Sequence, residues 1–519
     1  MGLTIFLALI SLPPFELIPD WQITPDDEEV YQLVEDSLFD LEMFSLQTPI
    51  RSHFLLRLRS DSIPEGFAEP AGFLRLNLLR RNQEACVIIE KDAGEKQFAD
   101  FWGGGLTLKT RGWRLTFGDY LLHFGRGLIF SSPYARSGFT ETGLGQSENV
   151  LARSAQENRN LRGFRIDRGS QRFRFSFVGS YSLRDATVNP DGTIARLRFS
   201  GMHRDSVSLR EKGKATQMLA GSIAQMQVSE RLSAGLAIQG IRFNRRFAPE
   251  DSVYSFSGQN LGAVSLFLKA GVRSRSGEVE IASSGFGAIA ASARVAVNEA
   301  GVNAAIAGSV YAARFFSPAG RAYALGRRLS RAEVNARVGY QQAGFFAAIE
   351  GNTHRDYLTD SIPGRLQFRT GYESKPVHVR FILGKRFDAE DERSRNSRIE
   401  IDTGWRVLTM RLTLGDEYCE GSSSRGRVAG LNIRSEIKSV DICFTGTLID
   451  ILGNGMRISA PESDVMRLGA VFSSKESAQR LSIAAAVKMK GLGRIGAKLA
   501  LTHKEDWQPD FAMQAEVIN

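Results

Sequence analysis

Phenylalanine alternates with polar residues along residues 172–177. Such alternation is typical of a β-strand with one apolar face and one polar face. In an extended strand, successive side chains point to opposite faces. One face of this strand would carry Phe173, Phe175 and Phe177, and the other would carry Arg172 and Arg174. Similar alternation recurs from residue 53 to the C-terminus. The pattern predicts either a large all-β protein packed against itself or a β-barrel in a lipid bilayer.

Hydropathy and length favour the barrel. The chain has 519 residues, of which 43% are hydrophobic and 51 are glycine. Beyond the N-terminus it has no run of about 18 uncharged apolar residues, which excludes a helical membrane protein but not a β-barrel, half of whose residues face water. At roughly 20 residues per strand and connection, residues 51–519 accommodate some two dozen strands. We therefore predict an all-β fold, a large antiparallel transmembrane barrel whose closure removes exposed edges.

The N-terminus combines an apolar segment with an acidic one. Residues 1–19 resemble a signal peptide, although no Lys or Arg precedes the apolar run. We expect this segment to direct export to the bacterial envelope, and the alternative is a short buried segment. Residues 24–46 have a helical period, with Thr24 at the N-cap position and an acidic first turn. Residues 20–50 are therefore expected to form a short acidic helical segment on the periplasmic side of the barrel.

Residues 118–162 interrupt the alternation and predict a long loop between two strands. Long loops on barrels fold inward, cap the mouth or bind partners. Four charged residues are candidates for a network that fixes this loop inside the lumen: Asp119, Arg126, Glu157 and Arg159. We interpret the network as a structural latch. A ligand site is the alternative, and catalysis ranks behind both.

No cofactor, metal or catalytic site is predicted. The 6 histidines and 3 cysteines have no ligand spacing. Residues 491–496 match a dinucleotide-binding pattern, but residues 498–503 alternate as a strand, so we interpret the glycines as part of a hairpin. His123 near Ser131 has no defined catalytic geometry and is interpreted as an ordinary loop histidine.

The basic character of the chain has several explanations. The net charge is +9, and the arginines are spread along the sequence. A lumen lined with Arg, a basic rim near anionic lipid headgroups and nucleic-acid binding would each use this charge. Arginines that merely cover the surface are the simplest explanation.

Several phrases resemble one family. They are GDYLLHFGRGLIF at 118–130, EKDAGE at 90–95, QENRNLRGFRI at 156–166 and FSGMHR at 199–204. On these phrases, residues 28–285 resemble the outer-membrane β-barrel proteins of Bacteroidetes-type bacteria that usually carry an N-terminal helix-hairpin-helix module. The resemblance implies an outer-membrane barrel preceded by an acidic helix. The module itself is absent, because only SLQTPI fills the gap between Phe44 and Arg51.

The sequence predicts an outer-membrane β-barrel that forms a pore or translocation channel for solutes. Phe173, Phe175 and Phe177 would face lipid, Arg172 and Arg174 would line the lumen, and solutes would be selected passively by size and charge. An occluded barrel that acts as a scaffold for surface or secretion machinery is the alternative, and nucleic-acid uptake is a third possibility. The expected partners are outer-membrane lipid and envelope or secretion proteins. An enzyme is not predicted.

Overall fold

The computed structural model divides the chain into two units, Met1–Pro49 and Ile50–Asn519. The described residues are those of the second unit, with gaps at 61, 64–65, 68–70, 92–98, 100, 132–149, 156–157, 171, 199–200, 202, 204–205, 249–255, 273, 286, 313, 321–330, 357–363, 375–376, 388–392, 406–407, 420–423, 453–457, 464–468, 490–492, 505–506 and 519. The expected signal peptide at 1–19 and the acidic helix at 24–46 lie outside the described residues.

Strands dominate the described chain. The wall contains β1 (Arg51–Ser60), β4 (Ala71–Arg80), β5 (Gln83–Lys91), β6 (Phe101–Thr110), β7 (Trp113–Tyr120), β8 (Leu161–Gly169), β9 (Phe173–Arg184), β12 (Ala215–Ser229), β13 (Leu232–Phe247), β14 (Gly258–Val272), β15 (Arg275–Ser284), β16 (Ala288–Glu299), β17 (Val302–Tyr311), β18 (Arg331–Gln342), β19 (Phe345–Asp356), β20 (Gly364–Ser374), β21 (Val377–Phe387), β22 (Arg393–Trp405), β23 (Leu408–Cys419), β24 (Ser424–Ile437), β25 (Val440–Leu452), β28 (Ala478–Met489), β29 (Gly493–His503) and β30 (Trp507–Ile518).

The remaining elements are small. They are β2 (Ser62–Ile63), β3 (Gly66–Phe67), β10 (Ala186–Val188), β11 (Ile194–Leu197), β26 (Ile458–Ser463), β27 (Gly469–Ser474) and helix α3 (Ser206–Glu211). Among the described residues, no helix is long and apolar enough to cross a membrane. β29 includes Gly493, Gly496 and residues 498–503 and pairs with β28 as a hairpin, which agrees with the predicted strand and hairpin.

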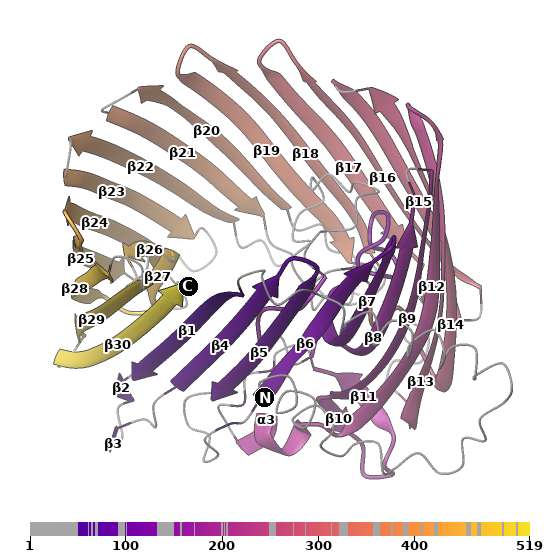
Figure 1. Ribbon diagram of the computed structural model, residues 1–519. Helices are drawn as coiled ribbons and strands as arrows, with labels where there is room; N and C mark the ends of the chain where they lie inside the picture. The colour runs from indigo at the N-terminus through magenta and orange to yellow at the C-terminus, as the bar shows by residue number, and fades with distance from the viewer. Residues whose placement is uncertain are drawn as a thin grey trace, which may run out of the picture. The chain divides into compact units, whose positions relative to one another are not determined.

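The wall closes into a barrel because β1 has a partner on each side. Leu56 lies opposite Leu74 of β4 and opposite Ala515 of β30. Apart from β10 and β11, the described strands of the 26-stranded sheet form a closed antiparallel wall of 24 strands in which each strand pairs with the next along the chain. Figure 1 shows β30, in yellow, returning to indigo β1. The prediction of a large barrel of about two dozen strands is confirmed.

The two ends of the barrel differ in their connections. One end, the turn end, has tight hairpins such as Arg111-Gly112, in which both residues have positive φ, 38° and 86°. Such two-residue turns match the twist of the paired strands, and glycine adopts positive φ without strain. The opposite end, the loop end, has the connections at 121–160, 185–214 and 312–330. The expected loop at 118–162 therefore begins at 121 and ends at 160.

Alternation determines which side chains face outward. On β14, Val264, Leu266 and Leu268 are exposed on the outer face, whereas the intervening Ser265 and Phe267 are buried. Exposed apolar side chains of this kind recur around the wall. The outer surface is therefore apolar, and the inner surface varies from one part of the wall to another.

Candidate functional site

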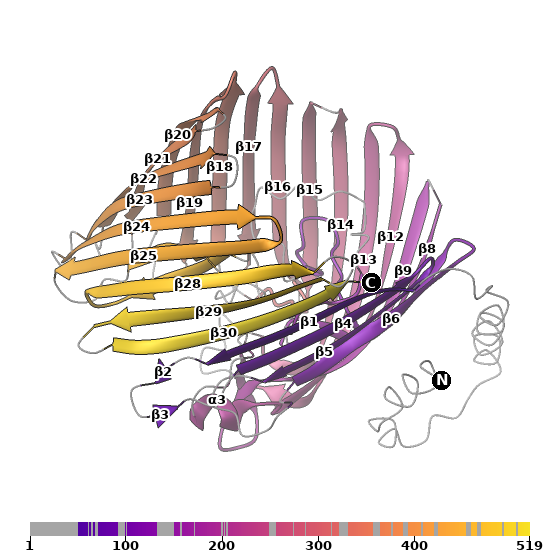
Figure 2. The same ribbon diagram turned by 60° about the vertical axis from the view of Figure 1, so that its left-hand side comes forward.

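The lumen is the candidate functional site, and residues 121–131 enter it from the loop end. We call this segment the inner loop. Its apolar side chains are buried: Leu122, Phe124, Leu128, Ile129 and Phe130. They belong to one cluster with inward-facing residues of the wall, among them Leu219, Ile223, Ile241, Phe243, Phe267 and Tyr311. We call β9 and β12 to β17 the packed wall, and Figure 2 shows the inner loop, in purple, inside the barrel beside β14 and β15.

Aromatic and backbone contacts hold the inner loop. The Phe124 and Phe267 rings lie 6.0 Å apart, centroid to centroid, in an edge-to-face arrangement. A second segment, residues 314–320 after β17, also contacts the inner loop. The Ser317 hydroxyl donates to the Ile129 carbonyl over 3.0 Å, and the Ser131 amide donates to the Ala319 carbonyl over 2.8 Å. The inner loop therefore lies between the packed wall and residues 314–320.

A buried charge cluster joins the inner loop to β15. The Arg126 guanidinium lies 3.1 Å from Glu278, and their side chains are 1% and 0% exposed. The Glu280 carboxylate accepts the Arg126 amide over 2.5 Å and the Leu128 amide over 3.3 Å. Paired and hydrogen-bonded in this way, the buried charges avoid the full penalty of leaving water. We call Arg126, Glu278 and Glu280 the latch.

Glycines allow the tight fold of the inner loop around the latch. Gly125 and Gly127 have φ of +54° and +83°, a region that residues with a side chain rarely adopt. A Cβ at Gly125 would also lie 2.8 Å from a Glu280 oxygen. The two glycines therefore allow the Arg126 and Leu128 amides to approach one carboxylate.

The predicted four-residue network divides between different partners. Arg126 enters the latch, whereas Asp119 lies 2.6 Å from Arg162 and accepts the Gly104 amide over 2.9 Å. Arg159 lies half-buried in the segment before β8, and Glu157 lies outside the described residues. Asp119 and Arg126 therefore have different partners. The carboxylates that contact Arg126 belong to β15, about 150 residues further along the chain.

The residues expected to face lipid and lumen lie on β9, except Arg172, which directly precedes it. Phe173, Phe175 and Phe177 are 46%, 44% and 54% exposed, and Ser176 between the last two is 1% exposed. Arg172 and Arg174 are exposed near the turn end, and alternation gives Arg174 the face of Ser176. The positions of Phe173, Phe175, Phe177 and Arg174 agree with the expected faces, whereas the face of Arg172 and the contacts with lipid and with the lumen remain predictions.

A different inner surface covers another large part of the wall. On β18 to β25 and β28 to β30, which we call the charged wall, acidic and basic side chains pair between adjacent strands or between strands separated by one other. Arg380 lies 3.2 Å from Glu400, and Arg494 lies 2.7 Å from Asp441. Further inward pairs are Arg411 with Asp402, Arg434 with Asp441, and Arg480 with Asp510. The Arg380 and Arg411 side chains are 41% and 47% exposed, so this surface is hydrated.

A polar tie connects three segments at the loop end. Asp185, between β9 and β10, accepts hydrogen bonds from His203 over 2.8 Å, from Asn158 over 2.8 Å and from the Gly213 amide over 2.9 Å. Burial raises the pKa of the Asp185 carboxyl, but the hydrogen bonds from His203, Asn158 and Gly213 outweigh burial, and the net pKa lies below the ordinary value of 3.8. The tie therefore depends on an ionised Asp185.

Sequence reasoning missed the carboxylates of the latch. Glu278 and Glu280 share the inner face of β15, whose other inward residues are small, while Lys269 and Arg294 lie opposite Glu278 on the neighbouring strands. Two acidic residues on one face of such a strand are the signal that could have revealed a buried partner. Among the described residues, no group of His, Cys, Asp and Glu could hold a metal ion.

Comparisons with known proteins find only remote structural similarity. No family model matches the chain, and no curated protein matches it. The P pilus usher PapC translocation pore is 9% identical, with a TM-score of 0.41, over 91% of this chain and 99% of that chain. The siderophore receptor PirA from Acinetobacter baumannii is 6% identical (TM-score 0.43; 92% and 81% covered), and OccK3 from Pseudomonas aeruginosa is 8% identical (TM-score 0.27; 93% and 99% covered). Because the sequence identities and TM-scores are this low, the function has to be inferred from the barrel itself.

Proposed function

We propose that the chain is an outer-membrane pore that passes polar solutes along the charged wall. The observation that carries the proposal is the contrast between the two faces of this wall. Outward-facing Val338, Ile349 and Leu366 are exposed, as a lipid-facing surface requires, while Arg380 and Arg411 on the inner face are also exposed. A wall apolar outside and hydrated inside suits a water-filled passage across a bilayer.

The direction of the barrel follows from its connections. Bacterial outer-membrane barrels have short periplasmic turns and longer extracellular loops. The turn end would then face the periplasm and the loop end the cell exterior. The resemblance of residues 28–285 to the Bacteroidetes-type family supports this location. Solutes would enter between the loop-end connections and leave beside the tight hairpins.

Selection in this pore would be passive and weak. Acidic residues of the charged wall, such as Glu400 and Asp441, each lie within 4 Å of two arginines. The acidic charges are thus compensated locally, and those arginines that are exposed, such as Arg380, are also screened by water and salt. A surplus of arginine at the passage gives a modest preference for anions.

Conductance measurements test the proposal. The full-length chain, refolded and inserted in planar bilayers, is expected to give stepwise currents with a reversal potential that shows anion preference. Replacing Arg380 and Arg411 by glutamine should reduce that preference while the steps persist. Folded protein, verified by its heat-dependent gel mobility, that gives no steps in any bilayer would overturn the pore.

A scaffold is the second candidate, and the packing of the inner loop favours it. Part of the lumen is already filled by the chain itself, and such a barrel could support envelope or secretion proteins at its loop end. Silent bilayers for the wild type, together with currents after removal of residues 122–130, would favour an occluded scaffold. Steps of equal size in both proteins would contradict it.

A further inference from the structure

The outer face of β13 changes from apolar to basic toward the loop end. Ile241 and Phe243 are buried in the inner cluster, so Arg242 between them points outward. Toward the turn end, Leu236 and Ile238 are exposed on the same outer face. A molecule lying along this strand would meet apolar surface first and then positive charge.

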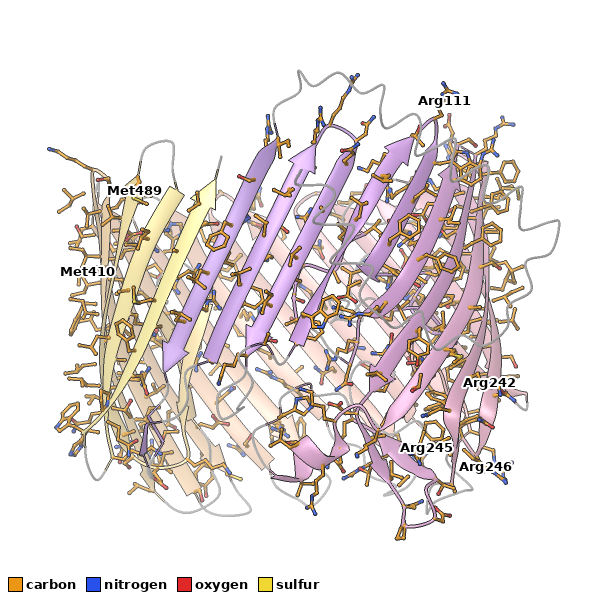
Figure 3. The ribbon with its side chains drawn as sticks, turned by 60° about the horizontal axis from the view of Figure 1, so that its bottom comes forward. Arg111, Arg242, Arg245, Arg246, Met410 and Met489 are labelled. Carbon is orange, nitrogen blue, oxygen red and sulfur yellow. The ribbon has the colours of Figure 1, made fainter. Side chains whose placement is uncertain are left out.

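Four cations gather where this change occurs. Lys214, Arg242, Arg245 and Arg246, which we call the basic rim, are all exposed. A register shift between Arg242 and Phe247 breaks the alternation, and this places Arg245 and Arg246 at the surface together. Figure 3 shows Arg242, Arg245 and Arg246 at one end of the barrel and Arg111 at the other.

The charge of the basic rim is not neutralised by the described residues. Arg245 is held by backbone carbonyls, with Nε 3.2 Å from the Lys214 oxygen and Nη1 3.0 Å from the Gly192 oxygen. Within the described chain, Arg242 and Arg246 form neither a hydrogen bond nor an ion pair. Adjacent like charges repel, so an anion bound among them is favoured.

The register of the sheet relates Arg242 to an outward-facing tyrosine. In the register of the sheet, Met218 lies opposite Tyr181 on one side and opposite Arg242 on the other. Tyr181 is exposed on the outer face. Tyrosine is enriched where hydrocarbon meets headgroups, because its ring is apolar and its hydroxyl is polar. Arg242 therefore lies two strands from a side chain that is typical of the membrane interface.

A shallow recess lies beside Arg242 on the apolar side. Gly240 is paired with Gly262 on β14 and with Ala220 on β12. A Cβ added at Gly240 or at Gly262 would meet nothing within 4 Å. The larger Ile238 and Val264 form the next outward row. The outer wall thus offers room for an aliphatic chain directly below a cluster of positive charge.

We propose that the basic rim binds the phosphate of an anionic membrane lipid whose acyl chain lies over Gly240 and Gly262. The proposal rests on the membrane location of the proposed function. An outward position at the loop end is not enough for an arginine to bind a lipid phosphate, as a second arginine shows. Arg425 on β24 lies 2.8 Å from Asp416, an acidic partner of a kind that Arg242 and Arg246 lack among the described residues. A cation cluster that no described residue neutralises, above an apolar recess, matches both parts of the lipid.

Lipid binding to the full-length chain in detergent tests the site, with native mass spectrometry as the readout. Phosphatidic acid is expected to bind more tightly than phosphatidylcholine, whose headgroup carries no net charge. The double variant Arg242→Gln, Arg246→Gln should weaken phosphatidic acid binding about 25-fold, at about fivefold per arginine. The matched control Arg425→Gln should leave binding unchanged, and Gly262→Leu should weaken it by filling the recess.

Three results would overturn the site. They are equal binding of phosphatidic acid and phosphatidylcholine, an equal loss in Arg425→Gln, and inorganic phosphate that displaces the lipid, which would indicate a free-phosphate site. If the double variant does not fold, Arg242→Gln alone, with Arg242→Lys as the charge-retaining partner, gives the same comparison. Conductance is measured separately, so a silent barrel that still binds the lipid would refute the pore and leave this site intact.

Discussion

The packed wall and the charged wall share one outer surface and differ in what their inner faces contact. On both, apolar residues such as Leu266 and Ile399 are exposed outward. Inward, Phe267 of the packed wall contacts the inner loop, whereas Arg411 of the charged wall contacts Asp402 and solvent. The same alternation therefore produces a closed, dry region and a hydrated one. What fills the lumen decides which region forms.

An ion pair is also expected to contribute more to the free energy of unfolding in the packed wall than in the charged wall. Arg126 and Glu278 are buried, and removing the Glu278 charge would take from Arg126 its ion-pair partner in a dry site. Arg380 is 41% exposed, and water can solvate it if Glu400 is lost. Matched changes in the two walls should therefore have unequal effects.

The largest difference is expected at the ion pairs. Glu278→Gln should reduce the free energy of unfolding by about 4 kcal/mol, because a buried charge loses its partner. Lys269 and Arg294, 3.5 and 3.9 Å from Glu278, would add to the uncompensated charge. Glu400→Gln is the control and should change it by about 1 kcal/mol or less. Denaturant unfolding in lipid vesicles measures both, and equal losses would erase the distinction between the walls.

The next difference concerns apolar packing. Phe124→Ala should reduce the free energy of unfolding by about 3 kcal/mol and release the inner loop, since the ring loses its contact with Phe267 and leaves a cavity. Phe346 on β19 faces the lumen and is half-buried, so Phe346→Ala should have a smaller effect. Protease cleavage within residues 121–131 reports release. An inner loop that stays protected in Phe124→Ala would show that packing does not hold it.

The shared outer surface can be tested at β9. Phe177→Arg would place a charge against lipid and should lower the free energy of unfolding by about 2 kcal/mol. Gln341→Arg, on the exposed inner face of β18, should have little effect because that face is hydrated. Unfolding in vesicles compares them. A tolerated arginine at position 177 would mean that Phe177 does not face lipid.

A smaller effect is expected from acid at the loop end. The pKa of Asp185 is lowered in the folded state, so its contribution to stability is present above 3.8, the ordinary value, and is lost as pH falls through the folded pKa. Pepsin should therefore cleave the 185–214 connection more readily with acidification below 3.8. Asp185→Asn should show cleavage already high and nearly independent of pH. If cleavage depended on pH in the same way in the wild type and in Asp185→Asn, Asp185 would not stabilise this connection.

Much of the fold follows from local sequence. Alternation with a period of two predicts the strands, and even the Ala- and Gly-rich β16 and β17 keep enough contrast, with Val295 and Ile306 facing outward. Length then predicts the approximate strand number, and the need to remove edges predicts closure. These inferences need only neighbouring residues.

The lumen contents were harder to predict because they depend on contacts between distant segments. Arg126 and Glu278 are 152 residues apart, and no periodicity connects them. The inner loop did carry a signal. Its apolar residues, Phe124 and Phe130 among them, are unusual for a solvated loop, and β14 is apolar on both faces at Leu266 and Phe267. A strand apolar on both faces indicates that something covers its inner side.

Thiol accessibility in the conducting state tests most directly whether solutes pass along the charged wall. Arg411→Cys and Ala307→Cys, on the inner faces of the charged and packed walls, would be made in a Cys419→Ser background, because Cys419 is the cysteine that is not buried. A negatively charged, membrane-impermeant thiosulfonate should reduce the current through Arg411→Cys and leave Ala307→Cys unchanged. Equal block at both positions, or block only at position 307, would contradict this account.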